Sequence, residues 1–295
     1  GYLVVENSPS LNPSDELTIL TWINGSAVPN PAEYLSHYDI FNTSDYLNWS
    51  QSENVTLDNG LLQLARLKVR TSEEKGLVLW LHFDEGNGTI AHDSSGYGND
   101  GTLYNGSVSC YNGNCPSWVE GRFGKALQFD GVNDYVEVAD STSISITDAI
   151  TIEAWIKINE VGWYGIIGKY NFRENRRSYL MQLDPDRPFE FVLSSDGASY
   201  HVLDSATLYE LDKWYHFINV WNGSTMKIFI NGRQDPNRAS FTGPIYDSPD
   251  PLRIGVTWDI RYFNGTVDEV RIYNNALDAK EISSLYKNHG HSSIH

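Results

Sequence analysis

The segment Ile150-Thr-Ile-Glu-Ala-Trp-Ile-Lys-Ile158 has an aliphatic residue at every second position along its whole length. Successive side chains of a β-strand point to opposite faces of a sheet, so this alternation predicts a long strand with one face in a hydrophobic core. The core face would consist of Ile150, Ile152, Ala154, Ile156 and Ile158, and the opposite face of Thr151, Glu153, Trp155 and Lys157.

Shorter alternating segments lie on both sides of this strand, separated by turn residues such as Asn222-Gly-Ser224. Many short strands joined by tight turns are typical of an all-β, antiparallel two-sheet sandwich. One helix is predicted at residues 279–288, because Asp278 and Glu281 form a capping box at its start. The other predicted strands are residues 76–83, 126–129, 134–138, 165–169, 179–183, 189–194, 200–203, 214–221, 226–230, 252–255 and 265–273.

The composition fits an all-β protein and argues against one class of function. Of the 295 residues, 13% are aromatic, and 24 Gly and 11 Pro supply turn residues. The formal net charge of −17 argues against a nucleic-acid-binding protein, which usually carries a basic face. No apolar stretch reaches the length of a membrane-spanning helix. Because the chain starts at Gly1 and not at Met, we expect a processed end or a cut inside a longer chain.

Two sequence features predict an extracellular protein. Cys110 and Cys115 flank an Asn-Gly turn signal and are predicted to form a local disulfide, since a metal site would need more ligands nearby. Eight Asn-x-Ser/Thr sequons are candidate glycosylation sites, although the Asn-Gly-Ser/Thr ones are also typical of turns. The sequons are Asn24, Asn42, Asn48, Asn54, Asn87, Asn105, Asn222 and Asn264.

The first 24 residues repeat part of the sequence that contains the long strand. Residues 1–24 align without a gap on residues 134–157, and nine of the 24 positions are identical. The chain is therefore predicted to open with two strands of a second copy. The predicted organisation is a partial repeat at 1–24, a β-rich connector at 25–75, the main β domain at 76–288 and a tail at 289–295.

A series of short motifs in residues 76–288 resembles the laminin-G-like (concanavalin A-like) domain of surface proteins. The resemblance implies a two-sheet jelly roll, but it does not fix a ligand, because function lies in sites and not in the fold. The motifs are Trp80-Leu-His-Phe-Asp84, Asp93-Ser-Ser-Gly96, Gly124-Lys-Ala-Leu-Gln-Phe-Asp-Gly131, Lys213-Trp-Tyr-His-Phe217, Met226-Lys-Ile-Phe-Ile-Asn-Gly232, Gly265-Thr-Val-Asp-Glu-Val-Arg-Ile-Tyr273 and Ala276-Leu-Asp-Ala-Lys-Glu-Ile282.

Calcium is the cofactor that this resemblance suggests. Proteins of the concanavalin A-like class often hold a structural Ca²⁺ between the first loops and an Asp of the final strand, and Ca²⁺ prefers carboxylate and carbonyl oxygens. The candidate ligands are Asp84, Asp93, Asp100 and Asp268, with Asp268 the best candidate. The alternative is that Asp93 and Asp100 only make turn hydrogen bonds.

Loop residues also suggest a sugar-binding surface. Aromatic faces stack on sugar rings, and Arg or Asp side chains bind hydroxyl groups. The alternative is that these aromatic residues only fill or cover the sheets. The candidate ligand-binding residues are Trp163, Tyr164, Arg173, Arg176 and Trp258, with Arg177 and Tyr262 nearby in the sequence.

Catalysis is not expected from this sequence. Glycosidases of this class need two carboxylates across a cleft. Here Glu153 is the only carboxylate in its strand, and Asp268 and Glu269 are expected to point to opposite faces of theirs.

Two hypotheses on function remain open at the level of sequence. The leading one is a secreted or cell-surface adhesion and assembly module, in which the strands of residues 1–24 pair with a neighbouring subunit in a filament or array. Its partners would be copies of itself or other surface proteins. The alternative is a carbohydrate-binding module of a larger secreted or surface enzyme, with glycans as ligands. The strands of residues 1–24 could instead fold back on their own domain, or belong to a repeat that was cut away.

Overall fold

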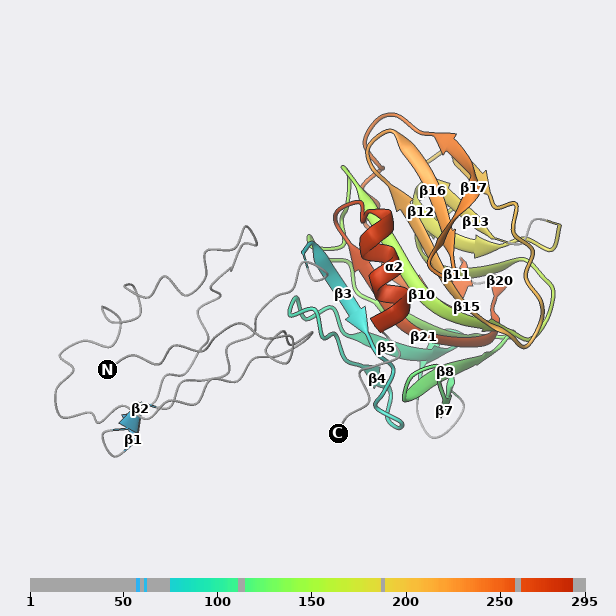
Figure 1. Ribbon diagram of the computed structural model, residues 1–295. Coiled ribbons are helices and arrows are strands. Elements are labelled where there is room, and N and C mark those ends of the chain that lie inside the picture. The colour runs from blue at the N-terminus through green and yellow to red at the C-terminus, as the bar shows by residue number, and fades with distance from the viewer. Residues whose placement is uncertain are drawn as a thin grey trace. The chain divides into compact units, whose positions relative to one another are not determined.

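The computed structural model describes residues 57–58, 61–62, 75–110, 115–186, 189–257 and 261–288 (Figure 1). The chain divides into two compact units, residues 1–75 and 76–295. The described part of the first unit contains one antiparallel strand pair, β1 (Leu57–Asp58) and β2 (Leu61–Leu62). The predictions for residues 1–24, for most of 25–75 and for 289–295 lie outside the described residues.

The second unit is built on two antiparallel sheets. In the eight-stranded sheet, β21 occupies a central place: it pairs with β10 along one edge and with β8 and then β3 along the other. The strands of this sheet, in spatial order, are β17 (Arg233–Ser240), β16 (Thr225–Ile230), β15 (Trp214–Trp221), β10 (Ile150–Ile158), β21 (Asn264–Tyr273), β8 (Lys125–Asp130) and β7 (Ser117–Glu120), with β3 (Leu77–Leu81) beside β21.

The nine-stranded sheet forms the other layer. The chain passes from it back to β21 through a small hairpin, β19 (Val256–Thr257) and β20 (Arg261–Tyr262). The strands of the nine-stranded sheet, in spatial order, are β14 (His201–Asp204), β13 (Glu190–Leu193), β12 (Arg176–Leu183), β11 (Tyr164–Asn171), β18 (Leu252–Ile254), β9 (Asp134–Val138), β5 (Gly101–Asn105) and β4 (Ile90–Ala91), with β6 (Val108–Ser109) beside β5.

The inner faces of the two sheets enclose one hydrophobic core. The core face predicted for β10 is confirmed, because Ile150, Ile152, Ala154, Ile156 and Ile158 all belong to this core. The prediction of an all-β two-sheet sandwich with one short C-terminal helix is therefore confirmed. Cys110 and Cys115 form the predicted disulfide, with 5.5 Å between their Cα atoms. Among the described residues, no helix is long and apolar enough to cross a membrane.

The outer face of the eight-stranded sheet is covered by α2 (Ala279–Asn288), which Figure 1 shows in front of β10 and β21. The predicted capping box starts this helix, because the Asp278 amide donates to Glu281 Oε2 at 2.7 Å and the Glu281 amide donates to Asp278 Oδ1 at 2.8 Å. Ile282 and Leu285 of the helix join a second apolar cluster with Ile218 and Val220 of β15. The central strands of this sheet are thus buried on both faces.

A buried polar network lies on the same outer face. Arg271 of β21 donates to Glu153 Oε1 at 3.2 Å and to Glu269 Oε2 at 2.8 Å. Its guanidinium also stacks over the Trp80 ring at 4.2 Å, and His216 Nε2 lies 2.8 Å from Glu153 Oε1. Burial of these carboxylates requires the cation, since unpaired charges are costly to remove from water.

A β-bulge overturns one expectation about β21. The register between β10 and β21 shifts between Glu153 and Trp155, and Glu269 takes a positive φ of 51°. The extra residue of a bulge breaks the alternation of faces. As a result Asp268, opposite Trp155, and Glu269, bonded to Arg271, both lie on the outer face. The expectation that they point to opposite faces was wrong.

We predict that Arg271→Met lowers the free energy of unfolding by about 3–5 kcal/mol, because Glu153 and Glu269 would stay buried without their cation. Urea unfolding measures this loss. Arg238→Met is the matched control: Arg238 is exposed on the edge strand β17, and its replacement should change the stability by less than about 0.5 kcal/mol. Equal small effects of the two substitutions would contradict the role given to Arg271.

Candidate functional site

The outer face of the nine-stranded sheet is polar and aromatic. Its strands alternate inward core residues, such as Val136, Tyr179 and Met181, with outward residues that are not part of the core cluster. Of the described elements, the β19–β20 hairpin packs on this side of β11, because a Cβ added to Gly165 would meet Thr257. The outward residues include Tyr104, Tyr135, Glu137, Tyr170, Leu180, Gln182, Glu190, Asp204 and Arg253.

Aromatic and charged side chains are stacked at one side of this face. The rings of Tyr104 and Tyr135 are parallel, with centroids 4.9 Å apart. The guanidinium of Arg253 lies 5.1 Å from the Tyr135 ring centre, and its Nε donates to Glu137 Oε2 at 3.0 Å. The charge of Arg253 is therefore paired with Glu137, and its guanidinium lies over the Tyr135 ring on the outer face.

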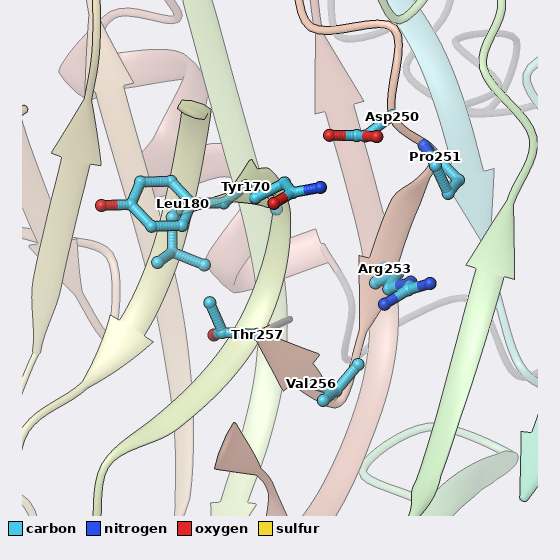
Figure 2. Close-up of a pocket in the computed structure, with 9 residues that line it drawn as sticks. Tyr170, Leu180, Asp250, Pro251, Arg253, Val256 and Thr257 are labelled. Atoms are coloured by element: carbon cyan, nitrogen blue, oxygen red, sulfur yellow. The ribbon is translucent and has the colours of Figure 1, made fainter. Parts of the chain in front are cut away.

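A small pocket opens in the middle of the face, between β11, β12 and β18 (Figure 2). Figure 2 shows Asp250, Pro251 and Arg253 on one side of it and Tyr170 and Leu180 on the other. Its free volume is about 10 Å³. Burial raises the pKa of Tyr170 to about 12, so its hydroxyl is protonated at neutral pH. The complete lining is Gly168, Tyr170, Asn171, Leu180, Asp250, Pro251, Arg253, Val256 and Thr257.

Two carboxylates face each other on the neighbouring strands of the same sheet. Glu190 of β13 is the register partner of both Asp204 of β14 and Gln182 of β12. Gln182 Nε2 donates to Glu190 Oε2. The pKa of Glu190 is raised to about 7: burial is the main cause, the hydrogen bond from Gln182 acts against the rise, and the neighbouring Asp204 contributes to it. This part of the face therefore holds hydrogen-bond acceptors, and the Glu190 carboxyl group is partly protonated near neutral pH.

An exposed indole borders the face. Trp163 is 47% exposed, and the guanidinium of Arg261 stacks over its ring at 3.9 Å. Arg261 is the register partner of Thr257, which lines the pocket. Burial lowers the pKa of Arg261, whereas Tyr170 and Glu190 act in the opposite direction.

Two of the predicted metal ligands converge on a second place, the turn at residues 121–125. Asp268 Oδ2 accepts the amide hydrogens of Arg122 and Phe123 at 2.7 and 2.9 Å, and Asp84 Oδ1 accepts that of Lys125 at 2.7 Å. Asp268 is fully buried, and its Oδ1 has no hydrogen-bond partner. Burial raises its pKa to about 8, helped by Glu269 and Asp84 and opposed by the two amides.

Comparison with known proteins defines the family of this chain. The family model described as the concanavalin A-like lectin/glucanases superfamily (Laminin_G_3) matches residues 130–283, which is more than half of the chain. The chain belongs to this superfamily. The expected laminin-G-like, concanavalin A-like family is thus confirmed. No curated protein is significantly similar to the chain in sequence.

Solved structures of this concanavalin A-like fold include domain 4 of AbnA, an extracellular arabinanase from Geobacillus stearothermophilus, in complex with arabinotriose. It is 19% identical, with a TM-score of 0.58, over 72% of this chain and 98% of that one. The binding domain of Paraclostridial Mosquitocidal Protein 1 is 16% identical, with a TM-score of 0.60, over 76% of this chain.

The botulinum neurotoxin serotype D ligand-binding domain, in complex with N-acetylneuraminic acid, is 18% identical, with a TM-score of 0.54, over 73% of this chain. The chain spans 54% of the mosquitocidal binding domain and 51% of the neurotoxin domain. At these identities the likeness shows a shared fold.

The ligand-binding residues predicted from the sequence do not lie together in the structure. Trp163 and Tyr164 lie at the start of β11, roughly 23 Å along the strand from its other end, where Arg173 follows the strand and Arg176 pairs with its last residue. Tyr164 packs against Phe263, and Arg176 is paired with Asp250 at 3.3 Å. Trp258 lies outside the described residues.

Sequence reasoning missed the residues at the centre of the face, namely Tyr170, Asn171, Arg253, Thr257 and Arg261. The sequence signal that could have found them is the set of polar positions in each alternating strand, which point away from the core. Arg253 and Tyr170 lie within or beside predicted strands at the polar positions, which can form the floor of a binding face.

The other two predicted metal ligands are engaged in a turn. The carboxylate of Asp93 accepts hydrogens from the amides of Trp80, Ser95 and Asn99, and Asp100 Oδ1 accepts the Asp93 amide at 2.7 Å. These are the turn hydrogen bonds of the alternative interpretation. Within the described part of the chain, no three His, Cys, Asp or Glu side chains gather into a metal site. The pair Asp84 and Asp268 fits a cation only if backbone carbonyls or water complete its coordination.

Four of the predicted glycosylation sites lie in the described domain. Asn87 and Asn222 are exposed in loops. Asn105 Oδ1 accepts from Asn133 at 3.1 Å, and Asn264 Nδ2 donates to Glu160 at 3.0 Å, so these two side chains are already engaged. Asn24, Asn42, Asn48 and Asn54 lie outside the described residues.

We predict that Ca²⁺ stabilises the protein, because Asp268 Oδ1 gains a partner. At a Ca²⁺ concentration 100 times its dissociation constant, the thermal midpoint of unfolding should be about 5–10 °C higher than in the presence of a chelator. Asp268→Asn should abolish this shift. Asp100→Asn should keep it, since the Asp100 carboxylate already serves the turn. Differential scanning calorimetry with and without chelator measures the effect. An unchanged midpoint of the parent protein would remove the calcium prediction.

Proposed function

We propose that residues 76–288 form an extracellular carbohydrate-binding module that uses the outer face of the nine-stranded sheet. The observation that carries this proposal is the combination on one face of an exposed indole, stacked tyrosines and a pocket with buried polar atoms. The opposite outer face packs against α2 through an apolar cluster.

The chemistry of the face matches what sugars present. A sugar ring offers C–H faces that stack on aromatic rings and hydroxyl groups that pair with amides and carboxylates. Trp163 supplies the stacking surface, and Gln182, Glu190 and Asp204 supply hydrogen-bonding groups. Arg261 fixes the indole from one side, so less side-chain freedom is lost when a ligand stacks on the other.

The comparisons support this reading over the adhesion and assembly hypothesis. Domain 4 of AbnA is in complex with arabinotriose, and the neurotoxin domain is in complex with N-acetylneuraminic acid. The assembly hypothesis rests on residues 1–24, which lie outside the described residues, and it stays a prediction. The disulfide supports a secreted protein.

We also propose that the module binds without catalysing a reaction. Glu153 and Glu269 are held by Arg271 on the face that α2 covers. Glu190 and Asp204 face each other on adjacent strands, whereas glycosidases place two carboxylates on opposite sides of the scissile bond.

The test is a glycan array with the purified chain, followed by calorimetric titration of the best ligand. We expect a dissociation constant below 1 mM, and we expect Trp163→Ala to weaken binding by about 3- to 10-fold through lost stacking. Tyr97→Ala is the matched control, because Tyr97 is a similarly exposed aromatic (51%) in a loop elsewhere. A chain that binds no glycan on the array would contradict the proposal.

A further inference from the structure

Two histidines lie opposite each other at the end of β3, in the eight-stranded sheet. Leu81, the last residue of β3, forms an antiparallel bridge with Asp93, so the next pair in this register is His82 and His92. Side chains that are directly opposite in an antiparallel pair lie on the same face, with Cβ atoms about 4.5–5.5 Å apart. The two imidazole rings therefore extend from neighbouring positions on one face.

Carboxylates on the flanking strands orient both rings. His82 Nδ1 lies 3.1 Å from Glu269 Oε1 of β21, the strand that pairs with β3 on the side away from His92. His92 Nδ1 lies 3.4 Å from Asp100 Oδ2, which directly precedes β5, the partner of β4. Each Nδ1 thus faces away from the other histidine, and each Nε2 is left on the side between the two rings.

A carboxylate at Nδ1 prepares an imidazole to bind a metal ion. The carboxylate accepts the Nδ1 hydrogen, so the neutral ring carries its lone pair on Nε2. Histidines that bind metals are commonly held in this way, because the carboxylate fixes the orientation of the ring and makes its other nitrogen a better ligand. His82 and His92 share this arrangement, and they therefore form a pair of oriented nitrogen ligands.

The surroundings of the pair favour a cation. His82 and His92 border an open cavity of about 350 Å³, whose other lining residues are Asp84, Glu85 and Ser94. Glu85 Oε1 accepts the His92 amide hydrogen at 2.7 Å, whereas its Oε2 has no hydrogen-bond partner. An unpaired carboxylate oxygen beside two imidazoles attracts a positive ion and can accept a hydrogen from water bound to that ion.

We propose that His82 and His92 bind one divalent transition-metal ion, such as Zn²⁺, through their Nε2 atoms. Water fills the other coordination positions, because no three His, Cys, Asp or Glu side chains among the described residues form a group that could hold a metal. Imidazole is a good ligand for Zn²⁺ and Cu²⁺, whereas Ca²⁺ prefers oxygen. This site therefore differs from the calcium site predicted at Asp268, and it does not depend on glycan binding.

The test is a calorimetric titration of Zn²⁺ into the full chain with its three tail histidines changed to Asn, so that the tail does not compete for the metal. We expect one Zn²⁺ per chain, with a dissociation constant below about 100 µM. His82→Asn and His92→Asn each keep an amide in place of Nδ1 and remove Nε2, and each should weaken binding by at least about tenfold. The tail histidines, His289, His291 and His295, lie outside the described residues.

Two matched controls show whether the effect is local. His201→Asn replaces an exposed histidine on β14 of the other sheet and should leave the dissociation constant within about twofold. Asp268→Asn should do the same, since Asp268 does not border the cavity. The thermal midpoint of each variant without metal identifies the folded ones. Because 68% of the His92 side chain is exposed, His92→Asn keeps the test decisive even if His82→Asn unfolds the protein.

Two results would overturn the inference. One is the absence of saturable Zn²⁺ binding to the chain with the substituted tail. The other is binding that His82→Asn and His92→Asn leave unchanged, which would place the ion elsewhere. Neither result bears on the proposed function, because no sugar enters this experiment.

Discussion

The pairing of β21 with three other strands is the interaction on which the rest of the domain depends. This last strand pairs with β10 along one edge and with β8 and β3 along the other, so it joins the beginning, middle and end of the domain. Its inward residues, such as Val267 and Ile272, lie in the core. Its bulge places Asp268 beside the turn at residues 121–125 and Glu269 against Arg271. One local departure from strand alternation thus positions both the candidate cation ligand and the buried ion network.

The two outer faces of the sandwich have different roles for a physical reason. Beyond Arg271 and its carboxylates, the face around β10 carries Ile218 and Val220, whose burial against α2 removes apolar surface from water. The face around β11 and β12 carries Tyr170, Gln182 and Glu190, which gain little from such a cover. A helix on one side and a polar, aromatic surface on the other follow from this difference. The proposed binding face is therefore a consequence of how the second sheet is patterned.

The sequence predicted the elements in which local pattern and tertiary position agree. The strand at Ile150–Ile158 and the helix at Ala279–Asn288 have the bounds expected from alternation and from the capping box. It missed β17, because Arg233–Ser240 is a polar edge strand with a proline and no alternating face. It placed Asp268 and Glu269 on opposite faces, because a bulge has no mark in an otherwise regular pattern.

For the candidate site, the sequence predicted the types of side chain but not their positions. Aromatic and arginine side chains were expected to bind sugar, but Trp163 and Arg176 lie at opposite ends of one hairpin. Asn171 and Thr257 looked like ordinary polar residues, since their lack of hydrogen-bond partners depends on how β11, β18 and β19 come together. Such a property arises from tertiary packing and has no local signal.

A nuclear magnetic resonance titration with the best neutral oligosaccharide most directly tests whether the outer face of the nine-stranded sheet is the binding surface. We predict saturable amide shifts centred on Tyr170, Thr257 and Arg261, with the amides of α2 unchanged. Shifts confined to α2 or to the turn at residues 121–125 would contradict this assignment, as would the absence of any saturable shift.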